Sequence, residues 1–137
     1  MDTKTKGMIG VTAILADLTA KGFLVSLPVS EHSPFDLIIS QGNQHKTVQV
    51  KYRELKDNTL DIKLASVWSN KQGSHIIPMN KDLIDILAIY CPDTKKCYYL
   101  NPKKYKTSVT LRVKSADDQT PKLDRQNLAD DFLELPE

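Results

Sequence analysis

The first twenty residues carry a hydrophobic pattern that predicts an amphipathic helix. Small and apolar residues recur at i, i+4, i+7, i+8 and i+11, namely Gly7, Val11, Ile14, Leu15 and Leu18. This spacing places them on one face of a helix with about 3.6 residues per turn. The pair Lys21-Gly22 is typical of a helix end, so we expect a helix over residues 4–21.

After this helix, alternating apolar and polar residues separated by turn signals predict strands. We expect a short strand over residues 23–27, which ends at Pro28, and a hairpin of strands 35–39 and 47–52 joined at Gly42-Asn43. Further strands are predicted over 60–67, 74–79, 84–91, 97–100 and 108–113. A helical turn is expected after Asn101-Pro102, and weak helical spacing covers residues 123–135.

A helix followed by a mostly antiparallel sheet, with more helix late in the chain, predicts an α/β (α+β) domain. The 137 residues suit one domain, and no internal linker is visible. Because no apolar run is long enough for a membrane span or a secretory signal, we expect a cytoplasmic protein.

Charge is distributed unevenly along the chain. Residues 1–114 contain 17 Lys/Arg against 10 Asp/Glu, whereas residues 115–137 contain 2 against 7. We therefore divide the domain into a basic body, 1–114, and an acidic C-terminal tail or helix, 115–137. A basic body suits a polyanion such as nucleic acid.

Cysteine and histidine positions do not suggest a metal or nucleophile site. Cys91 and Cys97 flank a predicted turn, and no second Cys or His pair completes a zinc site. We expect two free thiols in a reducing compartment. The chain also lacks a G-x-S-x-G elbow and a Walker-type phosphate loop.

The strongest chemical signal is a charged residue in each strand of the predicted hairpin. Strand alternation places Asp36 on one face of its strand, and Gln49 and Lys51 together on one face of the next. With the turn centred on Gly42-Asn43, Asp36 lies opposite Gln49, with Cβ atoms about 5 Å apart. An aspartate between Phe35 and Leu37-Ile38-Ile39 is costly to bury as a lone charge, so it needs a cation beside it, which either Lys51 or Mg²⁺ supplies.

Two interpretations of this cluster follow. In the first, Mg²⁺ is bound by the Asp36 carboxylate, the Gln49 side-chain carbonyl and the Val50 backbone carbonyl, and Lys51 orients or deprotonates an attacking water. This arrangement suits metal-assisted phosphodiester hydrolysis. In the second, the cluster is a structural ion pair on a sheet face.

These residues resemble a known family. Pro34-Phe35-Asp36 is followed thirteen residues later by Gln49-Val50-Lys51, behind a helix that opens with Lys6-Gly7. The pattern is similar to the PD-(D/E)XK nuclease core, with Gln49 where most members carry Asp or Glu. With the later stretches 85–92 and 97–100, it resembles the PD-(D/E)XK homing endonucleases of group I introns. The resemblance covers residues 4–113.

The resemblance implies a restriction-endonuclease-like core, a central mixed sheet flanked by helices. It also implies Mg²⁺-dependent cutting of double-stranded DNA, with Mn²⁺ as a substitute, at a long pseudo-palindromic site by a homo-oligomer, either a dimer or a tetramer. Asp36 would be the metal ligand, Gln49 the substitute for the second acid and Lys51 the catalytic lysine. Val11 stands where members commonly carry a helix glutamate, and each missing acid weakens Mg²⁺ binding. We therefore expect weakened or absent cleavage.

Basic and amide side chains give candidate DNA contacts. The predicted phosphate contacts are Lys46, Arg53, Lys56, Lys63, Lys71, Lys103, Lys104 and Lys106. The predicted contacts at base edges are Trp68, Asn70, Gln72 and Arg112. The alternative for each is an ordinary solvated face. Tyr90, Tyr98 and Tyr99 are expected in the core or at a subunit interface.

Two alternative functions remain open from sequence. One is a Holliday-junction resolvase on the same core, which would prefer four-way junctions over linear sites. The other is a DNA-binding module that does not cut, which would bind DNA without Mg²⁺ in a salt-dependent manner.

Overall fold

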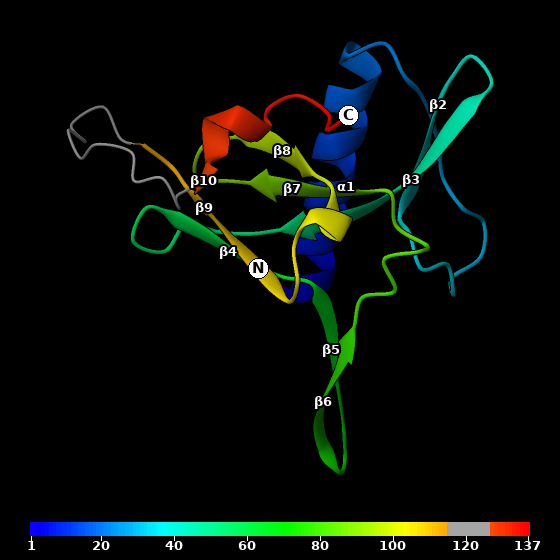
Figure 1. The fold of residues 1–137 in the computed structure, drawn as a ribbon. Coiled ribbons are helices and arrows are strands. Elements are labelled where there is room, and N and C mark those ends of the chain that lie inside the picture. Colours follow the sequence, from blue (N-terminus) through cyan, green and yellow to red (C-terminus); the bar gives the residue numbers. More distant parts are fainter. Residues whose placement is uncertain (115–126) are drawn as a thin grey trace.

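The computed structural model describes residues 1–114 and 127–137 (Figure 1). The chain opens with helix α1 (Thr3–Ala20). The helix begins at Asp2, whose side chain accepts a hydrogen bond of 2.7 Å from the Thr5 amide, because the first amides of a helix lack intrahelical partners. It ends at Lys21, and Gly22 follows with φ of 97°, a conformation that glycine adopts without strain.

The main sheet has five strands in the order β1-β2-β3-β7-β8. The bounds are β1 (Leu24–Ser26), β2 (Leu37–Gln41), β3 (Gln44–Tyr52), β7 (Ile86–Cys91) and β8 (Lys96–Leu100). The central pair β3 and β7 is parallel, and the other neighbours are antiparallel. The sheet is therefore mixed, and it confirms the expected fold class.

A second, smaller sheet packs beside the first. It contains β10 (Asn127–Leu128), β9 (Ser108–Arg112) and β4 (Thr59–Lys63), in that order. A separate two-stranded hairpin, β5 (Ala65–Asn70) and β6 (Gly73–Pro78), projects away from the two sheets (Figure 1). Two short 3-10 helices, η1 (Pro102–Lys104) and η2 (Ala129–Phe132), complete the described elements.

The structure corrects two predictions of secondary structure. The strand expected over 60–67 is two strands, because the chain leaves β4 at Leu64 and enters the projecting hairpin. The weak helical spacing over 123–135, for which a tail was the alternative, does not give an α-helix where the chain is described: residues 127–132 form β10 and the 3-10 helix η2. Residues 123–126 lie outside the described part. The helical turn after Asn101 is confirmed as η1.

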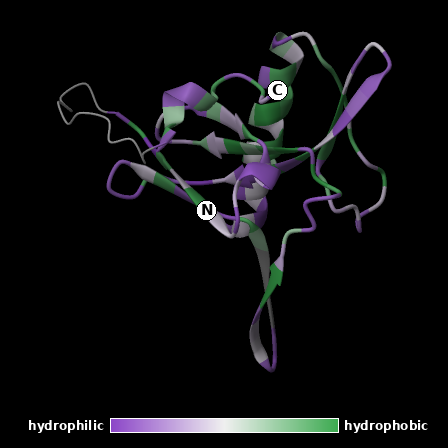
Figure 2. Ribbon diagram, viewed as in Figure 1, coloured by the Kyte–Doolittle hydropathy of each residue, from purple (hydrophilic) through white to green (hydrophobic). Residues whose placement is uncertain are grey.

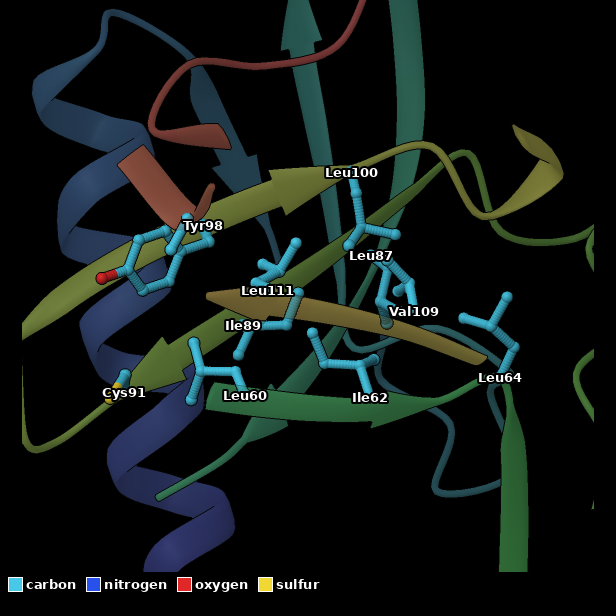
Figure 3. Packing of buried hydrophobic residues seen from close by; sticks show 11 residues of the cluster. Leu60, Ile62, Leu64, Leu87, Ile89, Cys91, Tyr98, Leu100, Val109 and Leu111 are labelled. Atoms are coloured by element: carbon cyan, nitrogen blue, oxygen red, sulfur yellow. The ribbon is translucent and has the colours of Figure 1, made fainter. Parts of the chain in front are cut away.

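The core has two parts, one on each face of the main sheet. On one face α1 packs Ile14 and Leu18 against a cluster that includes Leu37, Val48 and Ala88. On the other face, β7 and β8 pack against β4 and β9, and Figure 3 shows their side chains pointing toward one another. These residues include Leu60, Ile62, Leu87, Ile89, Tyr98, Leu100 and Leu111. Strand β7 is thus buried on both sides.

Hydropathy follows this layering (Figure 2). The tips of the β2–β3 and β5–β6 hairpins are hydrophilic, whereas β7 is apolar along its length. Among the described residues, no helix is long and apolar enough to cross a membrane.

Candidate active site

The hairpin of β2 and β3 carries the predicted site, and its register is the expected one. Leu37 pairs with Val48 at one end and Gln41 pairs with Gln44 at the turn, where Gly42 has φ of 60°. Asp36 lies one residue before β2, so the expected direct pairing with Gln49 is not part of the ladder. Instead, the Asp36 amide donates to the Val48 carbonyl at 2.9 Å.

The Asp36 side chain continues the ladder where the backbone of β2 no longer does. Its Oδ2 accepts a hydrogen bond of 2.7 Å from the Val50 amide. In a strand, the N–H and C=O of one residue point to the same side, so the Val50 carbonyl faces the same edge as the Asp36 carboxylate. The structure therefore brings two oxygen donors to the point where β2 and β3 separate.

Gln49 and Lys51 share the opposite face of β3 from α1. They lie beside Leu87 and Ile89 of β7, which belong to the cluster against the second sheet. The Lys51 Nζ donates to the Ala65 carbonyl at 3.3 Å, at the start of the β5–β6 hairpin. The Gln49 Oε1 is buried and has no hydrogen-bond partner among the described residues. A buried oxygen without a partner is costly, and a cation or a water at this point would satisfy it.

Burial opposes both charges at the site. It raises the pKa of Asp36, and the Val50 amide and the Lys51 charge oppose that rise. Burial also lowers the pKa of Lys51 to about 8, helped by the nearby Arg53 charge and opposed by Asp36. Since the burial effect is the larger one for both groups, the site shifts each toward its neutral form.

The donor set fits one hard divalent cation. The Asp36 carboxylate, the unpartnered Gln49 Oε1 and the Val50 carbonyl are all oxygen donors, the type that Mg²⁺ prefers. Within residues 1–114 and 127–137, no three His, Cys, Asp or Glu side chains are grouped as metal ligands. The set therefore supplies a single carboxylate, as the sequence indicated.

Val11 supplies no oxygen to this set. It is partly buried against the apolar cluster beneath α1, which also contacts Val50. The helix passes close to β3 here, since a Cβ placed on Gly10 would lie 3.4 Å from the Val50 Cγ1. The interpretation of Val11 as a core residue is thus the one that its packing supports.

Sequence reasoning missed a cleft beside the site. It has a volume of about 470 Å³ and lies between the start of α1 and the end of β3. Lys6 and Glu54 form an ion pair of 3.2 Å on its wall, and the Lys6 ammonium lies 5.9 Å from the centre of the Tyr52 ring. The alternation of side chains along a strand could have predicted this cleft, because Val50, Tyr52 and Glu54 are spaced two residues apart and so point to the same side, toward α1.

The predicted DNA contacts lie in several places. Arg53 is half-buried, and burial lowers its pKa while the Asp61 charge opposes that shift. Lys71 and Gln72 are at the tip of the β5–β6 hairpin. The other exposed predicted contacts are Lys46, Lys56, Lys63, Asn70, Lys103, Lys104 and Lys106. Arg112 is half-buried, and the Trp68 side chain lies outside the described part.

The aromatic residues and cysteines have structural positions. Tyr98 and Tyr99 are buried in the core, and Tyr90 is half-buried with its ring centre 6.1 Å from that of Tyr52. Cys91 and Cys97 are free, as expected. Burial raises the pKa of the Cys97 thiol to about 11, so this thiol is unreactive near neutral pH.

The mixed sheet and the positions of Asp36, Gln49 and Lys51 match the pattern of the PD-(D/E)XK nuclease class, and comparison with known proteins identifies the family. The family profile described as PD-(D/E)XK endonuclease matches residues 1–134. The chain belongs to this family. Its fold is similar to that in a solved structure of a bacterial homing endonuclease, I-Ssp6803I, at 19% identity and a TM-score of 0.73. The match covers 89% of this chain and 86% of the other. No curated protein sequence matches this chain.

Proposed function

We propose that this chain is a divalent-metal-dependent, site-specific endonuclease of double-stranded DNA of the intron-homing type. The observation that carries the proposal is the buried Gln49 Oε1, which has no partner among the described residues. It belongs to the strand whose Val50 amide binds the Asp36 carboxylate and which also carries Lys51. A divalent cation is one ligand that would satisfy this oxygen. Membership in the endonuclease family and the fold of the homing endonuclease support the same function.

Asp36, Gln49 and the Val50 carbonyl are the residues that would hold the ion, Mg²⁺ with Mn²⁺ as a substitute. When bound, such an ion supplies Lewis-acid stabilisation of the phosphate charge. Lys51 has a pKa of about 8, so near neutral pH its Nζ both donates hydrogen bonds and exchanges a proton. It would orient the attacking water and stabilise the charge on the phosphate.

The proposed substrate and assembly follow from charge and size. The exposed lysines of the body suit the phosphates of duplex DNA. One small domain spans a half-site, and symmetric DNA is usually bound by symmetric protein. We therefore propose a homo-oligomer, dimer or tetramer, acting on a long pseudo-palindromic site.

The test is cleavage of plasmid and genomic-fragment DNA with Mg²⁺ and with Mn²⁺. The variants are Lys51→Ala, Val11→Glu, and Lys4→Ala as an exposed control on α1. We expect metal-dependent cutting that is weak in the natural chain, stronger in Val11→Glu, and lost when Lys51→Ala is added to either. Cutting that survives Lys51→Ala, or no cutting in any variant, would contradict the proposal.

A non-cutting DNA-binding module is the second candidate, and the single carboxylate at the site is the observation that favours it. It predicts salt-dependent DNA binding in EDTA equal to that in Mg²⁺, with no product after long incubation. The same binding measurement with a four-way junction separates the resolvase alternative, which requires tighter binding to the junction than to linear duplex.

A further inference from the structure

The β5–β6 hairpin is the most prominent feature that the proposed active site leaves unexplained. It projects from the rest of the domain, and its distal half has no other described element beside it (Figure 1). Its two strands pair along their full length, from Ala65 with Pro78 to Asn70 with Gly73. An isolated two-stranded ribbon is marginally stable in water, so we expect this hairpin, called the arm below, to be supported by a partner.

The hairpin is connected to the active site at its root. The Ala65 carbonyl, the first residue of β5, accepts the hydrogen bond of the Lys51 Nζ at 3.3 Å. The Leu64 amide donates to the Thr107 carbonyl, and the Met79 amide donates to Leu64. The arm therefore starts at the lysine of the site and is held there by the second sheet.

Charge along the arm suits a polyanion. From Ile62 to Lys81 the chain contains Lys63, Lys71 and Lys81 and no Asp or Glu. This acid-free stretch includes the whole hairpin, in a chain whose composition is otherwise 17 acids among 137 residues. A partner that is an acidic polymer is favoured over a protein surface of mixed charge.

The tip presents a long amide and an ammonium on a fixed turn. Lys71 and Gln72 are exposed between Asn70 and Gly73. The Asn70 Oδ1 accepts the Gln72 amide at 2.8 Å and lies 3.2 Å from the His75 Nε2, so the turn is braced by its own side chains. Gly73 follows with φ of 119°. The Lys71 and Gln72 side chains thus extend from a preorganised turn.

We propose that the β5–β6 hairpin enters the major groove of duplex DNA, where Gln72 reads a base edge and Lys71 contacts the adjacent phosphate. This proposal deepens the proposed function and rests on it. The major groove is about 12 Å wide and admits a two-stranded ribbon, and glutamine pairs in bidentate fashion with adenine there.

Strand geometry limits where the base that Gln72 reads can lie. Seven residue steps lead from Ala65 to Gln72, which at about 3.3 Å per step is at most about 23 Å. Since base pairs are about 3.4 Å apart along the duplex, the base lies within about seven base pairs of the phosphate at Lys51.

The test is selection of bound sequences from a pool of random duplex DNA in EDTA, with the full chain. The variants are Gln72→Ala, Gln72→Glu and Lys71→Ala. The matched control is Gln44→Ala, an exposed glutamine beside the turn of the other hairpin. Thermal unfolding confirms that each variant is folded.

We expect Gln72→Ala to lower discrimination at one base position by about 5- to 100-fold, without abolishing binding. Gln72→Glu should change the preference at that position toward cytosine, whose amino group a carboxylate accepts. Lys71→Ala should weaken binding to all sequences and lower the salt dependence by about one charge. Gln44→Ala should leave the preference unchanged. Sequencing of cleaved ends should place the affected position within about seven base pairs of the cut.

Failure of this inference and failure of the proposed function give different results. No DNA binding by the natural chain, in EDTA or in Mg²⁺, overturns the proposed function and this inference together. Binding with a base preference that Gln72→Ala and Gln72→Glu leave unchanged overturns the inference and leaves the function standing. A hairpin that packs against a second copy would give that unchanged preference together with a lower oligomeric mass for the tip variants.

Discussion

At the scale of single residues, the site carries charges that folding disfavours. Burial raises the pKa of Asp36 and lowers that of Lys51 to about 8, so the environment favours the neutral form of each group. A salt bridge that favours both charged forms gives the opposite shifts. Shifts of this kind are common at functional sites and support the proposed function.

Asp36→Asn tests this directly. Asparagine keeps an oxygen that accepts the Val50 amide and removes the charge that burial disfavours. We expect the melting temperature to stay the same or rise by a few degrees, while metal-dependent cleavage falls at least about 100-fold. The exposed Asp82→Asn is the control. A loss of stability above about 2 kcal/mol would show that Asp36 is structural.

Val11→Glu tests the missing acid without relying on activity. Because Val11 packs against the apolar cluster beneath α1, a carboxylate there should cost about 1–3 kcal/mol of stability. Mg²⁺ should recover part of that loss, since a second acid strengthens binding to the folded state. The measurement is the Mg²⁺-dependent shift in melting temperature, with Val11→Gln as the neutral control. Equal shifts in both variants would exclude position 11 from the metal site.

At the scale of elements, the ends of α1 show how a local signal sets a boundary. The Asp2 carboxylate accepts the Thr5 amide at 2.7 Å, and this hydrogen bond lowers its pKa below the ordinary value. Its ionised form is therefore the one that the helix favours. The stabilisation it gives is present above the unfolded-state pKa and is lost as the pH falls through the lower folded-state value.

Asp2→Ala should therefore lower the melting temperature at pH 7, and the difference from the natural chain should shrink as the pH falls below about 4. Circular dichroism during thermal unfolding at several pH values measures this. The control is Asp82→Ala, at an exposed position. Asp57 is also exposed, but its φ of 53° is strained, so a substitution there would change the backbone as well as the charge. A difference that is constant with pH would exclude the capping role.

The sequence was sufficient where signals are local. Gly42-Asn43 and strand parity predicted the β2–β3 register, and with it the proximity of Asp36 to the Gln49-Lys51 strand. The break at Leu64 was not predictable, because its amide and carbonyl find partners at Thr107 and Met79, far along the chain. The unpartnered state of Gln49 Oε1 likewise depends on side chains from other elements. Helical spacing at Leu128 misled because β9 pairs with Asn127 and Leu128, which leaves only the short 3-10 helix η2 up to Phe132.

At the scale of the whole molecule, β7 joins the two halves of the core. Its residues alternate between the cluster beneath α1 and the cluster against the second sheet, so both faces are buried. The sequence of a strand that is buried on both faces is a nearly continuous apolar run, as in Ile86–Cys91. The stability of the two layers is therefore coupled through this strand.

Leu87→Ala measures that coupling. Leu87 is fully buried, so its truncation should cost about 2–5 kcal/mol in the free energy of unfolding. Leu24→Ala, at a position 70% exposed, is the matched control and should change it by about 0.5 kcal/mol or less. Denaturant unfolding followed by fluorescence and by circular dichroism should give coincident transitions. Two separate transitions would show that the layers unfold independently.

The parallel pairing of β3 with β7 also determines the order in which the molecule assembles. Thr47 and Asp85, which are hydrogen-bonded beside this pair, are 38 residues apart, whereas Asp36 and Val50 are 14 apart. Hairpins close in about 1–10 μs, and long-range strand pairs form more slowly because chain entropy is lost first. The residues proposed to bind the metal therefore meet in an early, local step, and the slow joining of the two halves of the chain then encloses them.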